Sequence, residues 1–107
     1  MNSKINSLTT LIECTKLLRL NEQDIKNANE FLKYNEFGLC FDTLVTQIYE
    51  NDIEITDYVY TLICKIGNEL QLPFDSYSYT KELVRNKGNI PKTVKDKLSN
   101  IIKLFLE

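Results

Sequence analysis

The sequence of 107 residues contains no histidine, only three glycines and only two prolines. Histidine is the commonest general base and metal ligand, so catalysis here would need a carboxylate, lysine, tyrosine or cysteine with a displaced pKa. The GxSxG, Walker-loop and HExxH motifs are also absent. No pair of carboxylates stands out as the acid and base of a glycosidase would. We therefore expect no enzymatic activity, no catalytic residue and no cofactor.

Cysteine is scarce as well. Cys14, Cys40 and Cys64 are odd in number, widely spaced and never form a CxxC pair. Without histidine to complete a ligand set we expect no metal site, and this cysteine usage suits a reducing compartment. No apolar run approaches the length of a signal-peptide core or a membrane span. The sequence thus predicts a cytoplasmic protein with no membrane partner.

What the chain does contain is typical of a globular protein, with 43% hydrophobic and 26% charged residues. Its length suits one domain with a modest core. Apolar residues recur mostly at three- and four-residue spacing, which is the period of an amphipathic helix. We expect an all-α fold over residues 1–107, a compact single-domain bundle of five to six antiparallel helices.

The first half of the chain predicts three of these helices. One covers about residues 3–20, and Asn21 is placed to cap a second, with Asp24 three positions further on. A third runs from about residue 36 to residue 51. Cys40 lies on it as a small buried apolar residue, and we expect this helix to be central, with Leu39 buried on a second side.

The second half predicts three more. Thr56 is a plausible N-cap of a regular amphipathic helix that Pro73 ends. A less regular helix covers about residues 77–86 and ends at Lys87 and Gly88. Pro91 then opens a last helix that extends through Phe105.

Charge is segregated along the chain. No lysine or arginine lies between Tyr34 and Cys64, and residues 34–80 carry a net charge of −7 against +1 for 1–33 and +4 for 81–107. A face of that sign repels nucleic acid and anionic lipid and attracts a basic partner. A solvated helix surface would give the same pattern.

The C-terminal part carries the basic residues Lys87, Lys92, Lys95, Lys97 and Lys103. The apolar residues of the same segment require its helix to dock on the core, so these lysines are explained by a solvated outer face. The acidic middle of the chain would oppose a phosphate backbone. We expect no nucleic-acid partner.

Helical wheels place several acidic side chains away from the predicted core. Asp57, Tyr60 and Cys64 lie nearly opposite the core face of the fourth helix, so Cys64 should be the most accessible cysteine. Asp42 and Glu50 lie off the core face of the third helix. Tyrosine among carboxylates suits a protein-binding surface, because the ring anchors contact while the charges select the partner.

The predicted binding residues are Asp42, Glu50, Asp52, Glu54, Asp57 and Tyr60. Asp52 and Glu54 belong to this set because they lie in the turn between the third and fourth helices. We interpret Tyr49 and Tyr58 as rings at the edge of the core.

A family resemblance points the same way. The segment LNEQDIKNANEFLKYNEFGLCFDTLVTQIYENDIEITDYVYTLICKIGNELQLP, residues 20–73, resembles the MafI-type immunity proteins of polymorphic toxin and contact-dependent growth inhibition systems. The resemblance is carried by NEFGLCFDTLVTQIYENDIEI, in which a helix begins at Asn-Glu-x-Gly and ends in a Tyr-Glu-x-Asp-Ile turn. It covers about half of the chain and leaves out residues 1–19 and the C-terminal helices of 74–107.

The resemblance implies a cytoplasmic protein that binds and neutralises a cognate secreted toxin domain, many of which are nucleases. An acidic helix pair suits the basic cleft of a nuclease, either by mimicking the charge of its substrate or by covering a neighbouring exosite. The alternative is an acidic helical adaptor or regulator that binds a basic protein of the host that is not a toxin.

Overall fold

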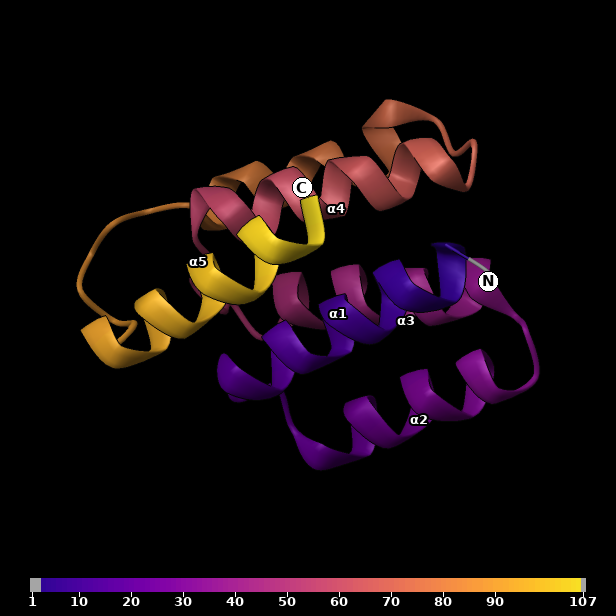
Figure 1. The fold of residues 1–107 in the computed structure, drawn as a ribbon, viewed down its shortest axis with the longest axis horizontal. Coiled ribbons are helices and arrows are strands. Elements are labelled where there is room, and N and C mark those ends of the chain that lie inside the picture. Colours follow the sequence, from indigo (N-terminus) through magenta and orange to yellow (C-terminus); the bar gives the residue numbers. More distant parts are fainter. Residues whose placement is uncertain (1–2, 107) are drawn as a thin grey trace.

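A computed structural model describes residues 3–106, and within that range it contains five α-helices and two short 3-10 helices (Figure 1). They are α1 (Ser3–Leu17), α2 (Glu22–Lys33), α3 (Phe37–Glu50), α4 (Asp57–Glu69), η1 (Phe74–Ser76), η2 (Ser78–Leu83) and α5 (Lys92–Leu106). An isolated parallel bridge between Ile55 and Val84 is the only extended pairing among the described residues. The predicted all-α class is confirmed.

Helix α1 lies at the centre of the bundle and contacts α2, α3, α4 and α5. Its buried residues include Leu8, Leu11 and Ile12, which join one continuous core with the inner faces of α3 and α4. Helices α2 and α3 form a helical hairpin in which α2 lies at one edge of the molecule and α3 lies behind α1, while α4 lies on the other side of α1 from α2 (Figure 1). The radius of gyration of 12.6 Å is that of one domain of this length.

The helix starts follow local side-chain signals. The Asn21 side chain accepts a hydrogen bond from the Asp24 amide at 2.9 Å, and Thr56 Oγ1 accepts one from the Val59 amide at 3.2 Å. Each cap satisfies an amide that the first helical turn leaves unpaired. Both predicted caps are confirmed. Pro91 precedes α5, and its carbonyl accepts the Lys95 amide at 2.9 Å, as expected for a proline that opens a helix.

The segment predicted as an α-helix over 77–86 is instead 3-10 helical, and that prediction was wrong in type. Its buried residues Tyr77, Thr80 and Leu83 follow one another at intervals of three, which matches three residues per turn. The Tyr77 ring packs over Gly67 of α4, where an added Cβ would lie 2.3 Å from the ring. It also meets Phe41 of α3 edge to face, at 5.9 Å between centroids. This segment therefore fills the space between α3 and α4.

Helix α5 runs in the same general direction as α4, so this neighbouring pair is not antiparallel (Figure 1). Lys65 of α4 lies over the Phe105 ring of α5, and Lys103 of α5 lies over the Tyr58 ring of α4. Two neighbouring helices can run in the same direction here because the connection over residues 70–91 is long enough to bring the chain back to the end of the molecule where α4 starts.

Candidate functional site

The outer face of α3 carries Asp42 and Glu50 as exposed side chains. They are eight residues apart, which is about 12 Å along a helix axis. The opposite face of α3 is buried through Phe41, Leu44 and other apolar residues, so the helix holds both carboxylates on a rigid element. Leu39 belongs to the same outer face and is 50% exposed. The prediction that Leu39 is buried on a second side of α3 was therefore wrong, although α3 does pack against α1, α2, α4 and η2.

A groove of about 460 Å³ separates this face from α2. Its lining residues are Asp24, Asn27, Glu30, Phe31, Asp42, Thr43, Thr46 and Gln47. None of these is basic, and three are acidic. Thr46 Oγ1 donates a hydrogen bond to Asp42 Oδ1 at 3.4 Å, which leaves the second oxygen of that carboxylate available. We call the groove and the outer face of α3 together the acidic face.

Sequence reasoning missed the contribution of α2 to this face. It assigned Asp24 to a capping position only and gave Glu30 no role. The signal was present, because Asp24, Asn27 and Glu30 recur at intervals of three along one side of α2. What the sequence alone could not supply was that this side lines a groove with α3.

Asp52 lies in the turn after α3 with a left-handed backbone, at a φ of 52°. Arg85 Nη2 donates to Asp52 Oδ1 at 2.6 Å, and this hydrogen bond together with the guanidinium charge lowers the pKa of the carboxyl. The side chain is exposed, so Asp52 remains on the surface. Its charge is already compensated by a residue of the same chain.

Glu54 does not lie on the exposed surface, where the sequence led us to expect it. Its exposed fraction is only 6%. The carboxylate accepts the Lys87 backbone amide at 3.2 Å and the Asn89 side-chain amide at 2.7 Å. Because a buried charge needs hydrogen bonds to offset its desolvation, Glu54 serves to hold the loop before α5 against the turn before α4.

Asp57 is exposed in the first turn of α4, where a carboxylate also complements the helix dipole. Tyr60, in contrast, is partly buried and packs against the core. Burial and a hydrogen bond with Cys64 raise the pKa of Tyr60 to about 12. The expectation that Tyr60 is the surface tyrosine was wrong. Tyr49 and Tyr58, which we interpreted as rings at the edge of the core, are exposed at 38% and 36%.

The six predicted residues therefore do not form one surface. Only Asp42 and Glu50 share a helix face, and Asp52 follows them in the turn. Asp57 lies in the first turn of α4, on a different helix from Asp42 and Glu50. The predictions for two cysteines are confirmed, because Cys40 is buried and Cys64 is more accessible; Cys14 is buried as well.

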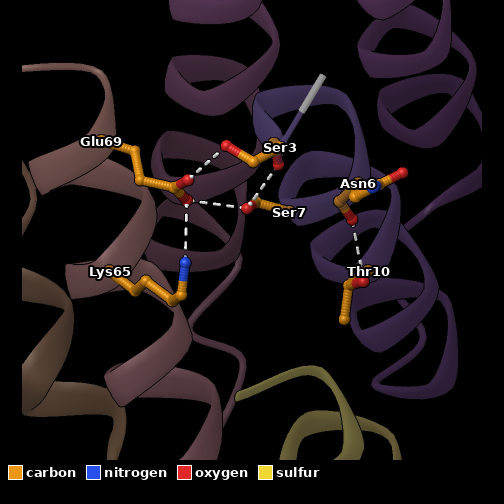
Figure 2. Close-up of polar contacts among 6 residues, drawn as sticks. All are labelled: Ser3, Asn6, Ser7, Thr10, Lys65 and Glu69. Atoms are coloured by element: carbon orange, nitrogen blue, oxygen red, sulfur yellow. Dashed lines mark hydrogen bonds and ion pairs between the residues drawn. The ribbon is translucent and has the colours of Figure 1, made fainter. Parts of the chain in front are cut away.

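Glu69 of α4 is at the centre of a polar cluster with residues of α1 and α4 (Figure 2). Ser7 Oγ donates to Glu69 Oε1 at 2.7 Å, Ser3 Oγ donates to Glu69 Oε2 at 3.0 Å, and Lys65 Nζ lies 3.3 Å from Oε1. The carboxylate is thus engaged by three donors. Burial acts to raise the pKa of Glu69, but these donors outweigh it and the net shift is downward. The cluster acts as a clamp between the two helices.

Among residues 3–106, every buried side-chain nitrogen or oxygen has a hydrogen-bond partner. No group of three or more histidine, cysteine, aspartate or glutamate side chains in that part of the chain is placed to hold a metal ion. None of the described helices has the length and apolar character needed to cross a membrane.

Comparisons with known proteins identify no relative of this chain. No protein-family model matches it, and neither a curated protein nor a solved structure matches it. The likeness to immunity proteins rests on the sequence of residues 20–73 alone.

Proposed function

We propose that this chain is an immunity protein that binds and neutralises a cognate secreted toxin domain, with a basic nuclease as the partner. The observation that carries the proposal is the acidic face, where Asp24, Glu30, Asp42 and Glu50 project from two packed helices with no basic residue lining the groove between them. The sequence resemblance of residues 20–73 supports the choice of partner.

The acidic face suits a basic partner for a physical reason. Exposed carboxylates of one sign on rigid helices create a local potential that speeds the encounter with a basic surface. On binding, these charges lose water, so the toxin must place lysine or arginine opposite them. The exposed Leu39 beside the carboxylates offers apolar contact area within the same footprint.

The contact residues of the proposal are Asp42 and Glu50, extended by Asp24 and Glu30 across the groove. Asp52 lies at the end of α3 and extends the footprint only if the partner competes with Arg85 for it. Asp57 lies apart from this footprint. This chain would neutralise the toxin by covering either the active site of the toxin or a neighbouring exosite.

Growth of bacteria tests the proposal directly. Cells would express the C-terminal domain of the polypeptide encoded immediately upstream, with and without this chain. Rescue of growth by this chain, and not by an unrelated acidic helical protein, is the expected result. Toxicity that this chain does not relieve, or the absence of a toxic neighbour, would favour the adaptor function instead.

Charge reversal then tests the surface. Asp42→Lys with Glu50→Lys should abolish rescue, because both changes lie on the outer face of α3. Glu13→Lys with Asp75→Lys is the matched control, since both residues are exposed, lie outside the acidic face and change the net charge equally. Equal loss of rescue from the two pairs would show that total charge, rather than this face, governs binding.

A further inference from the structure

A second groove lies along α2 and has the opposite charge. Its volume is about 740 Å³, and it runs between α2 and the C-terminal end of α1. Its charged lining residues are Lys16, Arg19, Glu22, Lys26, Glu30 and Lys33. Four of these are basic and two are acidic. Leu20 and Ile25 are 5% and 8% exposed and form an apolar floor.

The cations of this groove have no ion-pair partner in the described part of the chain. The ion pairs found between residues 3 and 106 join Lys65 to Glu69, Arg85 to Asp52 and Lys92 to Asp96. Lys26 and Lys33 are seven residues apart, so they lie on one side of α2 at about 10 Å along its axis. Lys16 of α1 and Arg19 of the turn that follows α1 line the same groove.

We propose that this basic groove is a docking site for an acidic peptide segment of a partner protein. The charge of the groove is complementary to carboxylates, and its apolar floor is complementary to one or two aliphatic side chains between them. This inference does not depend on the toxin partner, because the basic groove and the acidic face select partners of opposite charge, although Glu30 of α2 lines both grooves.

A peptide suits this groove better than a nucleic acid does. Glu22 and Glu30 lie among the four cations, and a continuous phosphate backbone would meet both of them. A peptide can place its carboxylates opposite the lysines and a neutral or donor side chain opposite the two glutamates. The acidic face adds further repulsion against a long polyanion.

The test is a titration of the ¹⁵N-labelled full chain at low salt, followed by NMR. The probe is an amphipathic peptide of leucine, alanine and glutamate, and its control is the same peptide with glutamine in place of glutamate. The expected result is that the glutamate peptide shifts the amide signals of Leu20, Ile25 and Lys26 while the control does not. Shifts spread evenly over α5 and η2 would overturn the proposal.

Two pairs of variants make the result specific. Lys26→Glu with Lys33→Glu should lower the affinity for the glutamate peptide by about tenfold or more, because two attractive contacts become repulsive. Lys81→Glu with Lys95→Glu changes the net charge equally, lies outside the groove and should have little effect. Equal weakening by both pairs, or tighter binding of a single-stranded DNA oligonucleotide at this groove, would contradict the proposal. The first pair should still rescue growth from the toxin, because the basic groove takes a different partner, and loss of rescue would contradict that separation.

Discussion

Replacing Glu54 should destabilise the fold, although its neighbours in sequence make it look like one more surface carboxylate. The side chain is 6% exposed and accepts two hydrogen bonds, from the Lys87 amide and from the Asn89 side chain. These bonds fasten the loop before α5 to the turn before α4. The adjacent Ile55 amide reinforces the same junction by donating to the Leu83 carbonyl at 2.9 Å.

The size of the effect follows from those two bonds. A hydrogen bond to a charged group contributes about 1.5–3 kcal/mol. Lys87 and Asn89 are exposed, so their N–H groups can form hydrogen bonds with water when the carboxylate is removed, which reduces the loss. Removal of both bonds in Glu54→Ala should therefore cost about 2–3 kcal/mol in total. A change of that size lowers the melting temperature of a domain of this length by about 10 °C. Glu54→Gln should cost about 1–2 kcal/mol, because the glutamine NH₂ group would take the place of one carboxylate oxygen and would face a hydrogen-bond donor of Lys87 or Asn89.

Urea denaturation followed by circular dichroism measures the difference. Glu50→Ala and Glu50→Gln are the matched controls, since Glu50 carries the same group on an exposed helix position and its replacement should change stability by less than about 0.5 kcal/mol. The reasoning is refuted if Glu54→Ala unfolds within about 0.5 kcal/mol of the wild type. It is refuted equally if the Glu50 variants cost as much as the Glu54 variants.

Three further predictions concern the core and its edges. Gly67→Ala should cost about 1–3 kcal/mol, because its Cβ would overlap the Tyr77 ring, and Tyr77→Leu should recover part of that loss in a double mutant measured by thermal unfolding. Cys64 should react first with Ellman's reagent in the native protein, since burial raises the pKa of Cys14 to about 12 and that of Cys40 to about 11; equal rates for all three thiols would contradict this order. The pKa of Glu69 is lowered in the fold, so its contribution is present above the ordinary glutamate pKa of about 4.3 and is lost as the pH falls through the lower folded value. The stability gap between the wild type and Glu69→Gln should therefore be larger at pH 7 than at about pH 3, and a gap that does not change with pH would contradict the clamp.

The parts of the fold that the sequence predicted are those that depend on neighbouring residues. Asn21, Thr56 and Pro91 act on backbone groups within four positions, so their roles as caps and as a helix start can be read locally. The amphipathic pattern of α4 is likewise local, and its apolar residues Val59, Leu62, Ile63 and Ile66 form the buried face of the helix.

The parts that the sequence missed depend on distant partners. Glu54 is buried by the loop over residues 83–89, which is about thirty positions away. A helical wheel gives the direction of Tyr60 but not the presence of the 3-10 segments that contact α4. The intervals of three at Tyr77, Thr80 and Leu83 were visible, but their meaning depends on the space that Gly67 leaves for the Tyr77 ring.

The candidate site also has a part that the sequence predicted locally and a part that depends on distant partners. Exposure of Asp42 and Glu50 followed from the wheel of a single helix, and the structure agrees. The acidic groove beside them required the packing of α2 on α3, which brought in Asp24 and Glu30 from an element that the sequence had assigned to structure alone.

Isothermal titration calorimetry between this chain and the toxin domain that the growth assay identifies is the most direct test of the acidic face. The wild type should bind the toxin, and Asp42→Lys with Glu50→Lys should weaken binding by at least about a hundredfold, since two desolvated charge pairs become repulsive. Glu13→Lys with Asp75→Lys should leave the affinity within about threefold of the wild type. Unchanged affinity in the first pair would contradict the account, because the toxin would then bind elsewhere on the molecule.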